Sequence, residues 1–199
     1  GLNYTAIPLN EDFSINHNDY KNIGKNVVIA NPNAPTGIAL SLDEIERIVA
    51  SNSDNVVIVD EAYVDFGGES AIPLTKKYDN LLVTQTFSKS RSMAGARLGF
   101  GVACPALIQD LNTVKYSTNP YNVNAMTMAA GVGTLADEEY TRQNCRTIME
   151  NRAWAKNQLE QLGFSVLDSK ANFLFAASPE IAGEELYKKL KARGVLVRH

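Results

Sequence analysis

The chain has 199 residues, of which 45% are hydrophobic and 21% charged, a composition typical of a soluble protein with one or two domains. The net charge of −3, with scattered basic residues, argues against nucleic acid or an anionic membrane as partner, and no apolar run is long enough to cross a bilayer. No signal peptide opens the sequence, so we expect the protein in the cytoplasm. The two cysteines are far apart and there are only two histidines, so we expect neither a disulfide framework nor a zinc site.

Three short apolar runs in the first half of the chain predict buried strands, at residues 25–30, 55–59 and 81–83. Between the first two, Ser41 and Glu44 have the spacing of a capping box and predict the start of an amphipathic helix. A short helix is expected before the third strand. Strands that alternate with helices predict a mostly parallel sheet with helices on both faces.

The second half of the chain mixes the two kinds of element. A further strand is expected at residues 97–103. The expected helices cover residues 105–115, 122–136, 138–162 and 184–193, and the later strands residues 164–167, 172–175 and 195–197. On the long helix, Ile148, Trp154, Leu159 and Leu162 are expected in the core. We therefore expect an α/β domain over residues 1–137, and a connecting helix with the start of a small α+β domain over residues 138–199.

Both ends of the sequence suggest a fragment of a longer protein. Residues 4–9 read as an extended segment already under way, and residues 195–197 read as a strand that stops in its middle. We therefore expect further chain on both sides.

Polar side chains follow each of the first three predicted strands: Asn33, then Asp60 and Tyr63, then Ser88 and Lys89. Because ligands of open α/β sheets bind outside the carboxyl ends of the strands, we expect these groups to converge. A lysine amine that is partly desolvated and near other cations can form a Schiff base with a carbonyl. The alternative for Lys89 is a solvated surface loop, which the convergence argues against.

Four motifs occur in order along the chain: Asn-Pro-Asn-Ala-Pro-Thr-Gly at residues 31–37, Val-Asp-Glu-Ala-Tyr-Val-Asp-Phe at 59–66, Thr-Phe-Ser-Lys at 86–89 and Ala-Gly-Ala-Arg-Leu-Gly at 94–99. In this order they resemble the class II aminotransferases, pyridoxal-phosphate enzymes of fold type I. Residues 66–70, 120–124 and 171–173 are most similar to the histidinol-phosphate aminotransferases. The resemblance covers nearly the whole chain.

The resemblance implies three catalytic residues and the cofactor pyridoxal 5'-phosphate. Lys89 would link to the cofactor aldehyde and then act as the base for the proton shift. Asp60 would pair with the pyridine nitrogen and keep it protonated, so that the ring can accept the electrons of the carbanion. Tyr63 would hydrogen-bond the ring hydroxyl.

Further binding residues follow from the same resemblance. Ser88 and Arg97 would hold the cofactor phosphate, with Thr86 on the same side of the strand as Ser88. Arg198 matches an arginine that contacts the substrate. The family usually has Asn before Pro-Thr-Gly, but Ala34 stands there, so either Tyr63 makes the contact with the ring hydroxyl alone or Asn33 shifts to help.

The implied activity is amino transfer between histidinol phosphate and 2-oxoglutarate, with a small-molecule amino donor and keto acceptor as partners and a homodimer as the working form. Threonine-phosphate decarboxylase and aromatic aminotransferase are alternatives on the same scaffold, and an inactive truncated fold is a third. The family's glycine-rich phosphate loop and ring-stacking aromatic would precede residue 1, and a further substrate arginine would follow residue 199. We therefore expect the 199-residue piece to bind the cofactor weakly or not at all, and the full-length parent protein to carry out the transamination.

Overall fold

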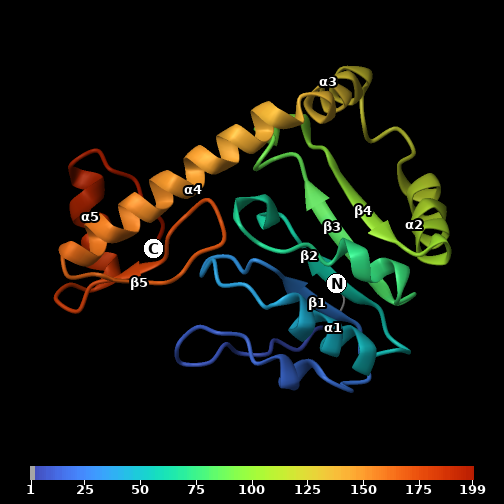
Figure 1. Cartoon of the computed structure of the whole chain (residues 1–199), viewed down its shortest axis with the longest axis horizontal. Coiled ribbons are helices and arrows are strands. Elements are labelled where there is room, and N and C mark those ends of the chain that lie inside the picture. The colour runs from blue at the N-terminus through green and yellow to red at the C-terminus, as the bar shows by residue number, and fades with distance from the viewer. Residues whose placement is uncertain (1–2) are drawn as a thin grey trace.

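The computed structural model describes residues 3–199, so the first two residues of the expected first domain lie outside the described part. A four-stranded sheet takes the strands in chain order: β1 (Val27–Ala30), β2 (Val57–Asp60), β3 (Leu81–Thr86) and β4 (Gly99–Ala103). The first three strands are parallel, and β4 runs antiparallel to β3 (Figure 1). The predicted mostly parallel α/β sheet is confirmed.

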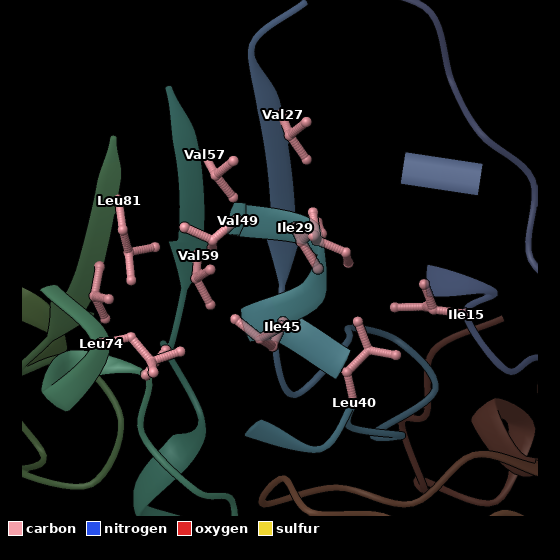
Figure 2. Packing of buried hydrophobic residues seen from close by; sticks show 13 residues of the cluster. Ile15, Val27, Ile29, Leu40, Ile45, Val49, Val57, Val59, Leu74 and Leu81 are labelled. Atoms are coloured by element: carbon pink, nitrogen blue, oxygen red, sulfur yellow. The ribbon is translucent and has the colours of Figure 1, made fainter. Parts of the chain in front are cut away.

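Helix α1 (Leu42–Ser51) forms because both its start and its inner face are specified locally. The Ser41 side chain accepts from the Glu44 backbone N–H, and the Glu44 carboxylate accepts from the Ser41 backbone N–H at 2.8 Å. Figure 2 shows the buried side chains of α1 packed between β1 and β2, where the inward residues of the strands meet them. Each such aliphatic side chain contributes about 1.5–3 kcal/mol by leaving water.

The short helix expected before β3 is two 3-10 turns, η2 (Val64–Phe66) and η3 (Ile72–Lys76). Two more 3-10 turns are η1 (His17–Tyr20), which packs near α1, and η4 (Ala94–Ala96). Gly67, with a φ of 113°, ends η2 in the left-handed region that glycine adopts without strain. Gly67, Gly68 and Pro73 interrupt the chain between β2 and β3, which favours these tight turns over a regular helix.

After β4 the chain becomes helical, as predicted. Helices α2 (Pro105–Thr118), α3 (Ala125–Ala136) and α4 (Glu138–Gln161) follow one another. Asn124 caps α3 by accepting from the Thr127 N–H at 2.9 Å, and Asp137 caps α4 through the Tyr140 N–H at 3.3 Å. Figure 1 shows α4 as a long diagonal rod that leaves the sheet and reaches the C-terminal elements.

The C-terminal part contains a two-stranded antiparallel sheet, β5 (Ser165–Val166) with β6 (Ala176–Ala177), and helix α5 (Gly183–Ala192). Two strand predictions are wrong here. The strand β6 lies just after residues 172–175, which contribute one bond from the Leu167 N–H to the Phe175 carbonyl at 3.0 Å, and residues 195–197 form no strand in the part of the chain that the structure describes. Apolar runs predicted these strands, but a strand also needs a neighbour to receive its hydrogen bonds.

The core assignment on α4 is also wrong in part. Trp154 is 67% exposed and Leu162 is 74% exposed, and the buried residues of α4 are Thr141 and Cys145, near its start. Beyond its first turns α4 has left the four-stranded sheet and packs against η2 and β5, so Ile148 and Leu159 are half-buried while Trp154 and Leu162 face solvent. The coverage of the main sheet is likewise uneven: α1, η1 and η3 cover one face, whereas Val28 on the other is 68% exposed. Within residues 3–199, no helix has the length and apolar character needed to cross a membrane.

Candidate active site

The carboxyl ends of β1, β2 and β3 lie at one edge of the sheet, because the three strands are parallel and in register. Asp60 ends β2 and is paired with Ala30 on one side and Thr84 on the other. Backbone hydrogen bonds continue the pairing past the strand ends, from the Asn31 N–H to the Asp60 carbonyl at 2.9 Å and from the Glu61 N–H to the Thr84 carbonyl at 2.8 Å. The loops that carry the predicted site residues therefore leave the sheet side by side.

Lys89 and Tyr63 come together from two of these loops. The Lys89 Nζ lies 5.1 Å from the centroid of the Tyr63 ring, within the range of a cation–π contact. Tyr63 is half-buried at the start of η2, and Lys89 is exposed in a turn closed by the Ser92 N–H to the Lys89 carbonyl at 3.1 Å. The chemistry expected from the sequence needs a partly desolvated amine, whereas here the amine faces solvent on the side away from Tyr63.

Asp60 is exposed on the sheet face opposite the α1 core. Its inward neighbour Val59 is fully buried, so the alternation of the strand turns the Asp60 side chain to the other face, beside Thr84. One carboxylate oxygen accepts from the Ala62 backbone N–H at 3.1 Å. The second oxygen has no hydrogen bond to any residue in the range 3–199, so it can accept from a ligand.

One loop, from the end of β3 to the start of β4, carries the predicted phosphate residues. It is closed by the Phe87 N–H, which donates to the Leu98 carbonyl at 3.0 Å. The Thr86 hydroxyl accepts from the Ser88 backbone N–H at 3.1 Å, and half-buried Ser88 precedes the lysine. The structure brings Thr86, Ser88 and Lys89 together at the beginning of this loop.

Arg97 lies at the other end of the same loop, in a turn and not in the predicted strand. Its φ of 56° is left-handed, and β4 begins two residues later. Its guanidinium donates to the Ala94 carbonyl at 3.0 Å and is otherwise exposed. Most of the planar fork of donors is therefore available to an anion.

Asn33 helps to hold the loop after β1. Its side-chain oxygen accepts from the Thr36 hydroxyl at 2.8 Å, and its carbonyl accepts from the Gly37 N–H at 2.8 Å. Buried Asn31, which was not expected to matter, also holds the loop: its amide group donates to the Leu40 carbonyl at 3.2 Å and accepts from the Leu40 N–H at 2.7 Å. This loop also contains cis peptide bonds before Pro32 and Pro35.

A segment from the C-terminal part returns to this edge of the sheet. The Lys170 N–H donates to the Gly37 carbonyl at 2.7 Å, and the Phe173 ring meets the Tyr63 ring edge-on, with centroids 5.0 Å apart. Arg152 of α4 donates to the Phe66 carbonyl at 2.9 Å and also to the Ala171 carbonyl. Residues 169–173 are therefore held at this edge, and Phe173 packs against Tyr63.

Arg198 is the predicted residue that the structure does not bring to this group. It lines an open hollow beside α5, together with Glu184, Tyr187 and Lys188. No hydrogen bond or ion pair joins it to the Lys89 loop among residues 3–199.

Glu61 is a site-supporting residue that was not predicted from the sequence. It is only 2% exposed, and its carboxylate accepts from the Ala71 N–H at 2.5 Å, the Ser70 hydroxyl at 2.6 Å and the Gln85 amide at 2.8 Å. Burial raises the pKa of the Glu61 carboxyl above its ordinary value, against these three donors, which lower it. Through Gln85, Glu61 connects the loop after β2 to strand β3, and Lys89 lies in the loop that follows β3. The position of Glu61 directly after Asp60 was the only signal in the sequence.

We expect Glu61→Ala to lower the free energy of unfolding by about 2–4 kcal/mol, because three donors lose their buried acceptor. The raised pKa also predicts a pH dependence. The folded chain binds the Glu61 proton more tightly than the unfolded chain, whose glutamate pKa is about 4.3, so this group's contribution to stability falls as pH rises from about 4.3 through the folded pKa.

Urea unfolding of Glu61→Gln between about pH 4 and pH 7 tests this, because glutamine does not titrate and should remove that part of the slope. Glu150→Gln, at an exposed position of α4, is the matched control. A pH slope unchanged in Glu61→Gln would contradict the assignment.

Comparison with known proteins gives a family. The family model described as aminotransferase class I and II matches residues 6–199. A histidinol-phosphate aminotransferase of Brachyspira hyodysenteriae is 52% identical over 199 residues, which are all of this chain and 56% of that protein.

Two solved structures are also similar. The histidinol-phosphate aminotransferase of Clostridium acetobutylicum has a TM-score of 0.86 at 27% identity, over 96% of this chain and 59% of that one. The L-threonine-O-3-phosphate decarboxylase of Porphyromonas gingivalis has a TM-score of 0.75 at 25% identity, over 87% and 54%. The chain thus spans a little over half the length of these relatives. Because the family model covers nearly the whole sequence, the chain belongs to the class I and II aminotransferases.

Proposed function

We propose that this chain carries the reactive lysine of a pyridoxal-phosphate-dependent transaminase that interconverts histidinol phosphate and imidazole-acetol phosphate, with 2-oxoglutarate and glutamate as the second pair. The observation that carries the proposal is the Lys89 amine, 5.1 Å from the Tyr63 ring centroid, at the edge of the sheet where β2 also ends in Asp60. The names of the similar proteins support the choice of substrate.

The residues at this edge fit the cofactor by the chemistry of their side chains. Pyridoxal phosphate has an aldehyde, a ring hydroxyl, a pyridine nitrogen and a phosphate, which call for an amine, a phenol, an acid and a cation. Lys89, Tyr63, Asp60 and Arg97 supply these four groups. Within residues 3–199, neither the Lys89 amine nor the Tyr63 hydroxyl has a hydrogen-bond partner, so both are available to a ligand.

Bound pyridoxal phosphate would supply an electron sink for the carbon that loses its proton. The chain's own groups would orient it and move the proton. The Asp60 carboxylate would accept a hydrogen bond from the pyridine nitrogen, and the Tyr63 hydroxyl would donate to the ring oxygen. The Lys89 Nζ would take the proton from the substrate carbon that bears the amino group.

The anion-binding residues would hold the other end of the cofactor. The Ser88 hydroxyl and the Arg97 fork would bind the phosphate, with Thr86 orienting the Ser88 N–H. Asn33 would steady the ring hydroxyl beside Tyr63, and Arg198 would contact the substrate. Residues 1–137 would form the cofactor-binding part, and residues 138–199 the connecting helix and the start of the small domain.

We also propose a homodimer that works in the cytoplasm on small-molecule donors and acceptors. Supporting the dimer, α2 and α3 expose large apolar side chains that a second copy would cover; they are Leu111, Val114, Tyr116, Met126, Met128, Val132 and Leu135. Sedimentation of the protein as a monomer at micromolar concentration would contradict this.

A second candidate is the decarboxylation of threonine phosphate, which the similarity to the decarboxylase structure favours. The two activities differ in products. We expect a full-length parent protein that contains this chain to consume 2-oxoglutarate and form glutamate when given histidinol phosphate, and to release no carbon dioxide from threonine phosphate. Carbon dioxide release without glutamate formation would replace the first function with the second.

A further inference from the structure

Ser90, the residue after Lys89, is a buried polar side chain without a role in the proposed chemistry. It is 6% exposed, although its neighbour Lys89 faces solvent. Its hydroxyl donates a hydrogen bond to the Asp65 carboxylate, which lies two residues after Tyr63. The bond therefore runs between the two loops that carry the amine and the phenol.

Each of these loops has its own backbone hydrogen bonds. Asp65 belongs to η2 and Tyr63 directly precedes that turn; the Phe66 N–H donates to the Tyr63 carbonyl at 3.2 Å and the Gly68 N–H donates to the Val64 carbonyl at 2.9 Å. The turn that carries Lys89, residues 87–93, is called the lysine turn. It is closed by the Met93 N–H, which donates to the Phe87 carbonyl at 2.9 Å. Among the described residues, the Ser90–Asp65 bond is the only hydrogen bond between the η2 turn and the lysine turn.

The far side of the lysine turn is held elsewhere. The Arg91 guanidinium lies 5.6 Å from the Phe87 ring centroid and donates to the Thr134 carbonyl of α3 at 3.0 Å. These contacts anchor the turn to the helices, away from Tyr63. The pairing of β3 with β2 and the Gln85–Glu61 bond hold the bases of the two loops, and the Ser90–Asp65 bond is the direct hydrogen bond beyond them.

We propose that Ser90 is a positioning residue, whose hydrogen bond to Asp65 sets the Lys89 amine over the Tyr63 ring. The inference rests on the proposed function, in which that amine reacts with an aldehyde. A hydrogen bond to a carboxylate is about twice as strong as one between neutral groups, so it suits a single tie between two loops. Displacement of a reacting group by about 1 Å can lower a rate by about 100-fold.

The first measurement needs no cofactor. Reductive ¹³C-methylation keeps the charge of lysines and gives each an NMR signal, and Lys89→Arg identifies the Lys89 signal. The ring current of Tyr63 shifts that signal upfield, as Tyr63→Leu verifies. We expect Ser90→Ala and Asp65→Ala to move the signal to the position of the solvated lysines. Asp65→Asn keeps an acceptor and should retain most of the shift.

The second measurement is the rate at which pyridoxal phosphate is trapped on Lys89 by borohydride. We expect Ser90→Ala and Asp65→Ala to slow trapping by about tenfold or more, and Asp65→Asn to restore it in part. Ser117→Ala, which removes an exposed helical hydroxyl of α2, is the matched control. Asp65 is exposed, so its variants keep the test informative if Ser90→Ala fails to fold.

An unchanged Lys89 signal and an unchanged trapping rate in Asp65→Ala would overturn the proposal. Failure of the proposed function has a different signature. In that case the unsubstituted protein traps no aldehyde on Lys89, while the NMR shift still reports whether Ser90 positions the amine.

Discussion

Replacement of Lys89 by alanine is expected to abolish covalent capture of pyridoxal phosphate and to lower amino transfer by at least about 10⁴-fold. Two losses combine, because the side chain would serve both as the nucleophile and as the base, and a positioned base alone contributes about 10²–10⁴-fold. No other lysine adjoins the Tyr63 ring in the described part of the chain. Borohydride reduction at millimolar cofactor, followed by peptide mapping, measures capture.

Lys89→Arg is the matched control for this prediction. Arginine keeps the positive charge over Tyr63 but stays protonated, so it cannot attack an aldehyde. We expect Lys89→Arg to be as inactive as Lys89→Ala and to keep the free energy of unfolding of the unsubstituted protein. Capture that persists in Lys89→Ala, or that maps to another lysine, would refute the assignment of the reactive amine.

Replacement of Gly37 by alanine is expected to lower the free energy of unfolding by about 2–5 kcal/mol. Gly37 has a φ of 77°, and an added Cβ would lie 2.2 Å from the Ser169 Oγ and 2.9 Å from its Cα. The left-handed conformation costs about 1–2 kcal/mol with a side chain, and overpacking adds about 1–3 kcal/mol. Since the clash includes the Ser169 Cα, the backbone of this segment would have to move away from Gly37.

Gly24→Ala separates the two contributions. Gly24 has a φ of 63°, but an added Cβ there would meet no atom within 4 Å, so only the backbone cost of about 1–2 kcal/mol is expected. Urea unfolding measures both variants. Equal destabilisation of the two would show that Ser169 yields freely, and partial recovery of Gly37→Ala by Ser169→Gly would confirm the contact.

The sequence predicted most of what local rules determine. The apolar runs of β1, β2 and β3, the capping box of Ser41 and the helix that follows are all found, because each depends on neighbours in the chain. The adjacency of Lys89 and Tyr63 was expected from the parallel order of the strands alone, and the structure places them in contact.

The failures have a common physical cause, because each concerns a residue whose environment is made by distant parts of the chain. Glu61 is buried because Ser70, Ala71 and Gln85 surround its carboxylate, and the residues next to it in the sequence do not predict this burial. Trp154 has an apolar side chain at helical spacing, but α4 has left the sheet before that turn.

The double contact of Arg152 has a mechanical consequence. Arg152 lies midway along α4, and its guanidinium donates hydrogen bonds to the Phe66 carbonyl and the Ala171 carbonyl. Burial lowers the pKa of that guanidinium, so the charge is held against a desolvation cost. A rotation of α4 would therefore also move the Tyr63 and Phe173 rings, because Arg152 is bonded to the segments that carry both of them.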